Sequence, residues 1–372
     1  LYVVAGGILV DVRARATPLN NTLLLAAGAI LANIVGTTGA SMLLIRPFMS
    51  MNSSDRDQRL RPYHILFFIF IVSNCGGCLT PIGDPPLYLG YLKGVPFSWT
   101  LTHLWPMWLL VNSTLLAVFF LLDTRAARRD PPASIIHGDA PRRGMRIAGA
   151  WGVASLVLIV ACVFVDPLLK QQWGIQHLPI GAALQILIAA AAYFLTPRHI
   201  HAANQFTFAP AKEVGILFAG IFATMMPALA YLDQHAPALG LTTPTQFYFA
   251  TGVLSAALDN APTYLSFLQI ASSVLGLQLT PADLDRLIHD SFLVIHPDGS
   301  RSDFVGQVML EAISLGAVFF GAATYIGNGP NFMVKAIAEG RGVKMPSFLG
   351  YLLFAAAVLG PVLALNWLVF IR

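Results

Sequence analysis

Long apolar stretches separated by short polar ones dominate the chain. The apolar stretches cover residues 1–12, 19–49, 62–95, 101–123, 146–169, 177–197, 212–232, 244–276, 304–339 and 346–371. Several exceed the roughly 20 residues that a helix needs to cross a bilayer. The pattern therefore predicts an all-α polytopic membrane protein.

Four of these stretches carry polar interruptions at membrane depth. Stretches 19–49 and 244–276 are too long for one perpendicular crossing, and each has a polar break at its middle. Stretches 62–95 and 304–339 contain longer breaks rich in Gly and Pro. Non-helical backbone at this depth is tolerated only inside protein or around a wet cavity. We therefore expect two re-entrant helical hairpins and two discontinuous transmembrane helices.

The distribution of basic residues favours hairpins over simple spans. If stretches 19–49 and 244–276 return to the side on which they start, 17 of the 22 Lys and Arg residues fall on one side. The exceptions are Lys93, Lys170, Arg286, Arg301 and Arg372. Single spans give a weaker asymmetry. By the positive-inside rule, the basic side is cytoplasmic, in an inner (plasma) membrane protein with a cytoplasmic Arg-rich linker at 124–145.

Hairpins entering from opposite sides are typical of an inverted repeat. The motif Thr80-Pro-Ile-Gly-Asp-Pro-Pro aligns with Thr324-Tyr-Ile-Gly-Asn-Gly-Pro, which sets Asp84 against Asn328. At the hairpin tips, Asn33 aligns with Asn260.

This alignment predicts the organisation of the chain. The first repeat covers 1–123, the linker 124–145 and the second repeat 146–372. The sequence opens within an apolar stretch, and the first repeat is about 80 residues shorter before its hairpin than the second. We therefore expect that the chain is N-terminally truncated and lacks two to three helices.

Composition excludes several classes of protein. Hydrophobic residues make up 56% of the 372 residues and charged residues 11%, compared with about 25% charged in an average soluble domain. The formal charge of +4 comes from basic residues in short loops, so no nucleic-acid binding is expected. The three Cys residues lie in apolar context and predict no disulfide framework.

Carboxylates inside the apolar stretches are rare and therefore informative. Asp84 and Asp259 lie in broken segments, and Glu311 lies in a helix that leads to a break. An Asp at the bilayer centre costs roughly 2.5–3.5 kcal/mol on insertion scales, so such residues are candidate functional sites. Asp84 and Asp259 could instead cap the helices that follow them. Glu311 could line an access path or pair with a neighbouring helix.

Two buried carboxylates beside unwound backbone predict a site for a small cation or a proton. Neutral oxygens from Asn and Thr side chains in the breaks are candidate ligands, and others among them satisfy freed backbone groups. An anion carrier would favour half-helix N-termini and cations instead.

The four broken segments carry a family resemblance. They contain the stretches Ala32-Asn-Ile-Val-Gly-Thr-Thr-Gly-Ala-Ser, Ser73-Asn-Cys-Gly-Gly-Cys-Leu-Thr-Pro-Ile-Gly-Asp-Pro-Pro, Ser255-Ala-Ala-Leu-Asp-Asn-Ala-Pro-Thr-Tyr and Gly321-Ala-Ala-Thr-Tyr-Ile-Gly-Asn-Gly-Pro-Asn-Phe. In these the chain resembles the ion transporter superfamily, which contains citrate-transporter-like and dicarboxylate carriers, arsenite permeases and NhaD-type sodium/proton antiporters. The NhaD-type antiporters look most similar.

The resemblance implies a transport domain of two hairpins and two unwound helices on a dimerising scaffold, and so a homodimer in the lipid bilayer. It implies one cation site near Asn33, Thr37, Thr38, Asn74, Thr80 and Asp84. It implies a second site near Asp259, Asn260, Thr263, Thr324, Asn328 and Asn331. Neither hairpin tip has the Ser-Asn-Thr of sodium-coupled dicarboxylate carriers.

The sequence therefore predicts a secondary active transporter, not an enzyme, that exchanges Na⁺ or Li⁺ for H⁺ by alternating access. It needs no cofactor besides the transported ions. One alternative is a sodium-coupled carrier of citrate-like di- and tricarboxylates, in which the Asp residues hold the coupling ion. Another is an arsenite or anion permease that acts with a separate ATPase.

Overall fold

The structure is a computed structural model that describes residues 1–13, 16–54, 57–58, 60–129, 144–166, 168–169, 179–204, 206–295 and 301–372. Its α-helices are α1 (Tyr2–Ala5), α2 (Pro18–Asn52), α3 (Pro62–Ile71), α4 (Pro85–Lys93), α5 (Phe97–Arg129), α7 (Ala150–Cys162), α9 (Ile180–Leu195), α10 (Arg198–Ala203), α11 (Ala209–His235), α12 (Pro244–Ala257), α13 (Asn260–Val274), α14 (Pro281–His289), α15 (Gly306–Phe320), α16 (Gly329–Gly340) and α17 (Phe348–Phe370). The 3-10 helices are η1 (Cys75–Leu79), η2 (Ala236–Leu239) and η3 (Gly321–Ala323).

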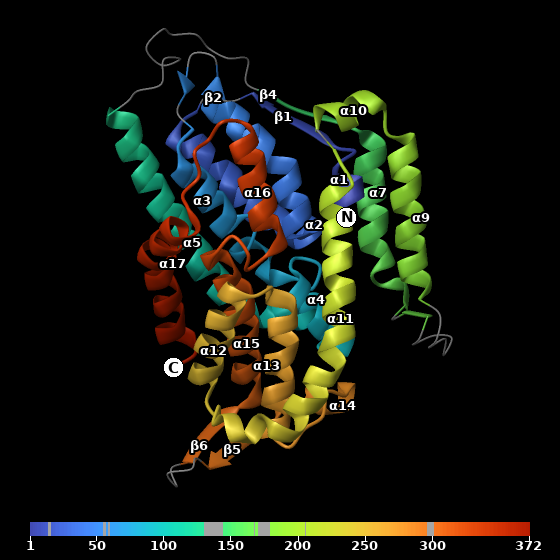
Figure 1. Cartoon of the computed structure of the whole chain (residues 1–372), viewed down its shortest axis with the longest axis vertical. Helices are drawn as coiled ribbons and strands as arrows, with labels where there is room; N and C mark the ends of the chain where they lie inside the picture. The colour runs from blue at the N-terminus through green and yellow to red at the C-terminus, as the bar shows by residue number, and fades with distance from the viewer. Residues whose placement is uncertain are drawn as a thin grey trace.

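Short antiparallel strand pairs lie at the two ends of the helical body (Figure 1). At one end, β1 (Leu9–Arg13) pairs with β4 (Gly144–Ala148), and β2 (Ser53–Ser54) with β3 (Asp57–Gln58). At the other end, β5 (Ser291–Ile295) pairs with β6 (Arg301–Val305).

Five helical segments of the described chain are long and apolar enough to cross a membrane. They are Pro18–Asn52, Pro62–Leu79, Phe97–Arg129, Gly306–Ala323 and Phe348–Phe370. Shorter apolar helices add Ala150–Cys162, Ile180–Leu195 and part of α11. The prediction of a mainly helical polytopic membrane protein is confirmed.

Helix α2 turns back on itself at Gly36, where the backbone leaves the helical region with φ 79° and ψ 155°. The side chains of Asn21 and Asn52, near its two ends, exchange hydrogen bonds of 2.9 Å. In one straight helix they would be roughly 46 Å apart, at 1.5 Å per residue. Residues 18–52 are therefore a helical hairpin whose open end lies beside β1 and β2 (Figure 1).

Helices α12 and α13 form a second hairpin that opens at the opposite end. The chain leaves the helical path at Leu258 and Asp259, between the two helices. The rings of Phe247, near the outer end of α12, and Phe267, in the middle of α13, have centroids 6.1 Å apart. In Figure 1 this hairpin opens toward the end that carries β5 and β6.

Two broken helices pass the hairpin tips in opposite directions. The first runs from α3 through η1 to α4, and the second from α15 through η3 to α16 (Figure 1). Each contains a non-helical stretch between its 3-10 helix and the α-helix that follows. Helix α4 packs on α13, and α16 packs on α2 and α3, so each broken helix contacts the hairpin of the other half.

A buried polar cluster holds the open end of the first hairpin. The Asp123 carboxylate, 1% exposed, accepts from Tyr63 Oη at 2.7 Å and from Asn21 Nδ2 at 2.9 Å. His64 Nε2 lies 3.2 Å from the same carboxylate. We call Asn21, Asn52, Tyr63, His64 and Asp123 the hairpin clamp, because they tie α2 to α3 and α5.

The linker begins later than the predicted residue 124. Helix α5 continues to Arg129, and Gly144–Ala148 form strand β4. The intervening residues 130–143 lie outside the described part of the chain.

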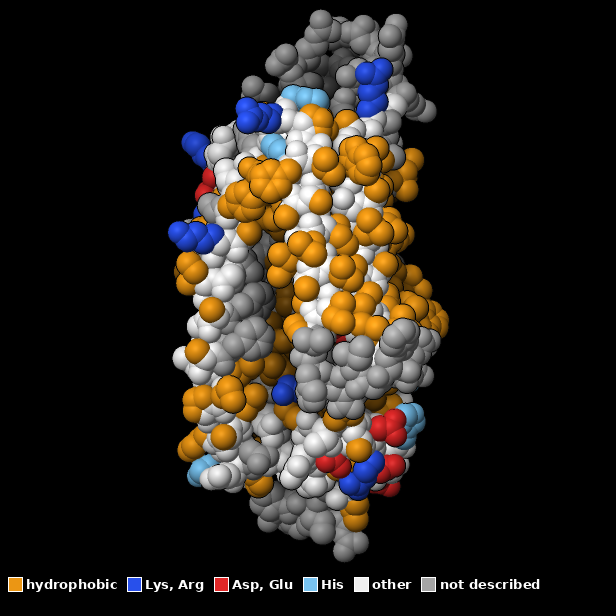
Figure 2. Space-filling view, turned by 90° about the vertical axis from the view of Figure 1, so that its right-hand side faces the viewer, with side chains coloured by type: hydrophobic (Ala, Val, Ile, Leu, Met, Phe, Trp, Pro, Cys, Tyr) orange, Lys and Arg blue, Asp and Glu red, His pale blue; other side chains and the backbone are white. Residues whose placement is uncertain are grey.

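Helices α7, α9 and α11 lie beside the hairpins and broken helices, and their outer face is apolar. Figure 2 shows hydrophobic side chains along this face, with charged side chains toward the two ends. Trp151, Ile186, Leu187 and Phe194 are all more than half exposed. An apolar band of this kind suits contact with lipid tails, because it exposes little that needs water.

Asn21→Ala should destabilise the protein because it leaves the Asp123 carboxylate and the Asn52 amide with unmade hydrogen bonds. We expect a loss of about 2–4 kcal/mol, seen as a lower melting temperature of the detergent-solubilised protein. Ser113→Ala is the control, because the exposed Ser113 hydroxyl bonds only to a carbonyl of its own helix. Equal melting temperatures for the two variants would show that the hairpin clamp is not needed for stability.

Candidate functional site

The Asp84 carboxylate is the meeting point of both hairpins and both broken helices. It is 1% exposed. One oxygen, Oδ1, accepts from Thr37 Oγ1 at 2.9 Å and from Asn328 Nδ2 at 3.0 Å. The other, Oδ2, accepts from Asn260 Nδ2 at 2.6 Å. Residues predicted for two separate cation sites therefore converge on one carboxylate.

Asp84 does not act as the helix cap that the sequence left open as an alternative. It occupies the N-cap position of α4, but its side chain makes no capping hydrogen bond. The first two residues of α4 are Pro85 and Pro86, which have no backbone N–H to donate. The carboxylate is therefore directed to side chains of other segments.

Three asparagines form a second layer that joins the two breaks. Asn328 Nδ2 donates to Asn74 Oδ1 at 3.1 Å, and Asn74 Nδ2 donates to Asn331 Oδ1 at 2.7 Å. Asn331 Nδ2 then donates to the carbonyl oxygens of Gly321 and Thr324, each at 2.8 Å. Buried amides bonded in this way hold the non-helical backbone of the breaks in one arrangement.

The two breaks share one local structure. In each, a Thr hydroxyl accepts at 3.1 Å from the N–H of the Gly three residues later, at Thr80–Gly83 and at Thr324–Gly327. The same hydroxyls donate to a carbonyl in the first arm of the adjacent hairpin, Thr80 to Asn33 at 2.5 Å and Thr324 to Ala256 at 2.6 Å.

These hydrogen bonds correct the predicted alignment of the hairpin tips. Asn33 corresponds in position to Ala256, and Thr37 corresponds to Asn260, so the alignment of Asn33 with Asn260 is four residues out of register. Asn33 and Asn260 are the same residue type, but their side chains make different hydrogen bonds. Asn33 donates to the Gly76 carbonyl at 2.7 Å and accepts from the Leu79 N–H at 2.8 Å, whereas Asn260 contacts Asp84.

The remaining predicted residues lie outside the Asp84 network. The half-buried Asp259 caps α13 by accepting from the Ala261 N–H at 3.0 Å, although it is near enough for its charge to act on Asp84. Thr263 donates to the Asp259 carbonyl at 2.9 Å. The half-buried Thr38 makes no side-chain hydrogen bond to any described residue. Glu311, 4% exposed, accepts from Gln307 at 2.6 Å on α15.

Helix dipoles, not basic side chains, offset the Asp84 charge. The second arm of α2 starts at Thr37, α4 at Pro85, α13 at Asn260 and α16 at Gly329, so four N-terminal ends meet at the carboxylate. Such ends carry partial positive charge. Among the described residues, no hydrogen bond or ion pair joins Asp84 to a Lys or Arg.

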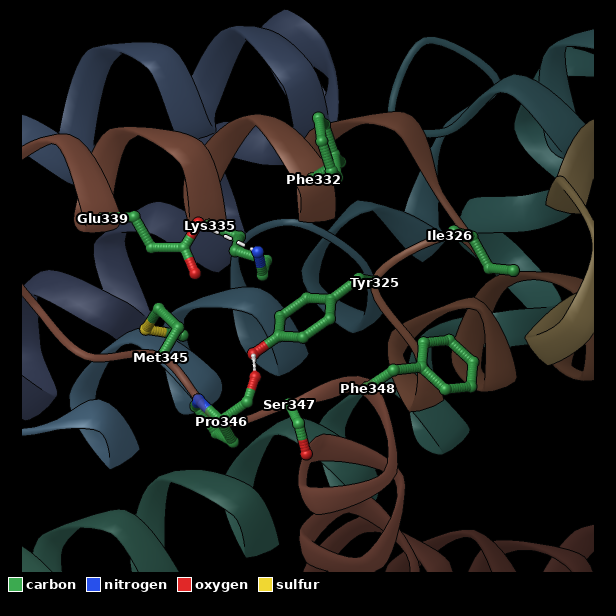
Figure 3. A pocket seen from close by; sticks show the side chains of 9 residues that line it. All are labelled: Tyr325, Ile326, Phe332, Lys335, Glu339, Met345, Pro346, Ser347 and Phe348. Atoms are coloured by element: carbon green, nitrogen blue, oxygen red, sulfur yellow. Dashed lines mark hydrogen bonds and ion pairs between the residues drawn. The ribbon is translucent and has the colours of Figure 1, made fainter.

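Lys335 is the basic residue nearest in sequence to a break, but its contacts are with residues other than Asp84. Its Nζ lies 2.9 Å from Glu339 and over the rings of Tyr325 and Phe332. These residues line a cavity of about 320 Å³ beside α16 (Figure 3). There the Tyr325 hydroxyl donates to the Pro346 carbonyl at 3.1 Å, so the cavity is bounded by the link between the second break and α17.

One buried oxygen at the centre lacks a donor. Asn260 is fully buried, and its Oδ1 has no hydrogen-bond partner among the described residues. It belongs to the same side chain whose amide holds Asp84. An unpaired carbonyl oxygen beside a carboxylate is the ligand chemistry of a hard cation. The described residues contain no cluster of three His, Cys, Asp or Glu side chains that could hold a resident metal.

Comparison with known proteins assigns the chain to a family. Residues 1–371 match the family model described as "Putative citrate transport". The chain belongs to this citrate transporter family. This assignment agrees with the predicted resemblance at the level of citrate-transporter-like proteins but does not support the predicted closeness to NhaD-type antiporters.

The relatives found for this member of the citrate transporter family have low sequence identity to it. An uncharacterized transporter of Mycobacterium bovis and one of Mycobacterium tuberculosis are each 26% identical over 347 residues, covering 90% of this chain and 72% of theirs. A 46 kDa membrane protein of Mycobacterium leprae is 25% identical over 349 residues, with the same coverage. Two of these relatives are named as transporters and one as a membrane protein, and none of the names gives a substrate.

Gly83→Ala should disrupt the first break, because a Cβ at this position would collide with the carbonyl oxygen of Gly77. Backbone cannot yield as a side-chain end can, so we expect a loss of about 1–3 kcal/mol or more. Thermal melting in detergent measures it. Gly329→Ala, beside the second break, is the matched control because nothing lies within 4 Å of its added Cβ. A Gly83→Ala variant as stable as this control would contradict the described packing.

Proposed function

We propose that the protein is a secondary transporter that exchanges Na⁺ for H⁺ at Asp84. The observation that carries this proposal is the buried carboxylate held by neutral donors from both hairpins and both breaks, with an unpaired Asn260 oxygen beside it. Such a site accepts a small cation or a proton. It offers no fixed positive side chain to an anion.

Mutual exclusion of the two ions follows from charge. With either Na⁺ or H⁺ bound, the Asp84 site is neutral and can pass through the low-dielectric interior. With neither bound, it carries a negative charge whose burial costs several kcal/mol. The loaded forms therefore move and the empty form does not, which couples an inward proton to an outward Na⁺.

Alternating access fits hairpins that open to opposite ends. We treat the two halves as an inverted repeat, supported by the shared Thr–Gly turn at the two breaks. Movement of the hairpins and broken helices past α7, α9 and α11 would expose Asp84 to each side in turn. In this proposal the protein is a homodimer in the plasma membrane, and α7, α9 and α11 form the dimer interface.

The basic end of the molecule supports the proposed orientation. Arg61, Arg125, Arg128, Arg129 and Arg146 all lie at the end that carries β1 and β4. By the positive-inside rule this end is cytoplasmic. The linker, which was predicted at 124–145 and follows α5 in the sequence, then belongs to the cytoplasmic side, and the first hairpin opens to the cytoplasm.

A second candidate function is cation-coupled transport of a citrate-like carboxylate. The description of the family favours it. The four helix N-termini at the centre also favour it, because such ends bind carboxylates. In this case Asp84 holds only the coupling ion, and the anion binds after the charge of Asp84 is neutralised.

Asp84→Asn should abolish exchange, because the amide keeps the shape of the side chain but cannot release a proton or offer a charge to Na⁺. The test uses everted membrane vesicles with an acid interior, in which the dequenching of a pH-sensitive dye follows proton exit on addition of NaCl. Asp259→Asn is the comparison: Asn also caps a helix well, so it should retain exchange with weaker Na⁺ affinity. Full exchange by Asp84→Asn would remove Asp84 from the mechanism.

The choice of anion separates the two candidate functions. Exchange at Asp84 should give the same dequenching with NaCl and with sodium gluconate, and no uptake of labelled citrate. A citrate carrier should be silent with both salts and accumulate labelled citrate only when Na⁺ or a pH gradient is present. The second pattern would replace the exchanger by the carrier.

A further inference from the structure

Glu311 is a buried carboxylate with no role in the hairpin clamp or in the hydrogen bonds of Asp84. It lies on α15 and is 4% exposed. It accepts a hydrogen bond from the neutral Gln307, and it forms no ion pair with another described residue. A buried carboxylate without a cationic partner is expensive in its charged form. Such a residue at membrane depth needs a functional reason.

The polar side chains of α15 form one stripe in an otherwise apolar helix. Gln307, Glu311 and Ser314 follow one another at spacings of four and three residues, which places them on one face. Gln307 is half-buried in the first turn of α15, next to β6 at the end opposite the linker. The stripe therefore runs from that end into the core.

Tyr264 continues the stripe toward Asp84. This fully buried side chain lies on α13, one turn after Asn260, which donates to Asp84. Its hydroxyl packs against Gly90 of α4, where any side chain would collide with it, and α13 packs on α15, which carries Ser314. Polar groups thus extend from Gln307 through Glu311, Ser314, Tyr264 and Asn260 to Asp84.

Two atoms along this track have no hydrogen-bond partner among the described residues. They are Ser314 Oγ, in a fully buried residue, and Asn260 Oδ1. Buried polar atoms without protein partners are the usual positions of internal water. Water at these two points would supply the missing steps between the side chains.

We propose that Glu311 relays protons between the external solution and Asp84. This rests on the proposed function, in which Asp84 exchanges its proton for Na⁺. A protonated Glu311 would pass its proton inward along the Ser314–Tyr264 track and be reprotonated from the outer side past Gln307. Each transfer breaks one O–H bond and forms another, so no other reactant is needed.

Between Gln307 and Asp84, Glu311 is the only carboxylate of the described residues on this track. The titratable residues of elements packed on α15 are Tyr248 on α12, Tyr264 on α13, Tyr88, Tyr91 and Lys93 on α4, Cys75 and Cys78 on η1, Asp283, Asp285, Arg286 and His289 on α14, His103, Asp123, Arg125, Arg128 and Arg129 on α5, and Arg301 and Asp303 on β6. On α14, the partly exposed Asp283 pairs with Arg286, and the exposed Asp285 pairs with His289.

Glu311→Gln tests the relay, because it keeps the size and the hydrogen bond to Gln307 but cannot carry a proton. In reconstituted vesicles we would compare two modes of the full chain. Exchange of ²²Na⁺ for Na⁺ needs Asp84 and movement but no proton transfer, so it should be unchanged. Exchange of Na⁺ for H⁺ should slow by at least about tenfold, and Glu311→Asp should recover part of the rate.

The outcomes separate the relay from the function on which it rests. Unchanged Na⁺/H⁺ exchange in Glu311→Gln would overturn the relay. Equal loss of both modes would also overturn it, because Glu311 would then serve the fold or the Na⁺ site. Asp84→Asn is measured beside it and should lose both modes. If that variant keeps both, the proposed exchange at Asp84 fails independently of the result for Glu311.

Discussion

The burial of one carboxylate away from water constrains the whole structure. Taking the Asp84 charge into the protein costs several kcal/mol unless donors surround it. No basic side chain of the described residues bonds to it, so the donors are neutral groups, and each lies at or beside the start of a helix. Four helix starts can meet at one point only if two helices are broken and two turn back as hairpins. The hairpins and breaks therefore supply the hydrogen-bond donors and helix N-termini that the buried Asp84 carboxylate requires.

The Gly and Thr residues of the breaks follow from the same constraint. Gly36 allows the turn that presents Thr37, with φ 79° and the Ile82 carbonyl 3.2 Å from where a Cβ would lie. In the breaks, Gly83 meets the carbonyl of Gly77, and Gly327 meets that of Gly321, so neither position has room for a side chain. The Thr hydroxyls bond backbone groups that a continuous helix would have satisfied. Side-chain chemistry thus replaces helical hydrogen bonds wherever the helix is interrupted.

Much of this arrangement could be predicted because charge is so rare in the apolar stretches. Asp84, the four broken segments and the neutral asparagines stand out in the sequence for that reason. Spatial convergence could not be predicted, because which residues of a break face inward depends on turn geometry, and a matched Asn pair therefore gave a register error of four residues. The hairpin clamp was missed because Asp123 lies near a segment end, where a charge usually faces water, and its partner His64 is distant in sequence. Asp259 follows the capping alternative, because an N–H of α13 lies within its reach.

The electrostatics of the centre relate the two candidate functions to each other. The helix N-termini that would attract a substrate carboxylate already face Asp84, so an anion and an ionised Asp84 would compete for the same partial charges. Binding H⁺ or Na⁺ at Asp84 removes that competition. An exchanger moves once Asp84 is neutral, whereas a citrate-like carrier must first neutralise Asp84 and then admit the anion. Binding of an ion at Asp84 therefore comes first in both mechanisms. The two differ in whether the helix N-termini then bind a substrate carboxylate.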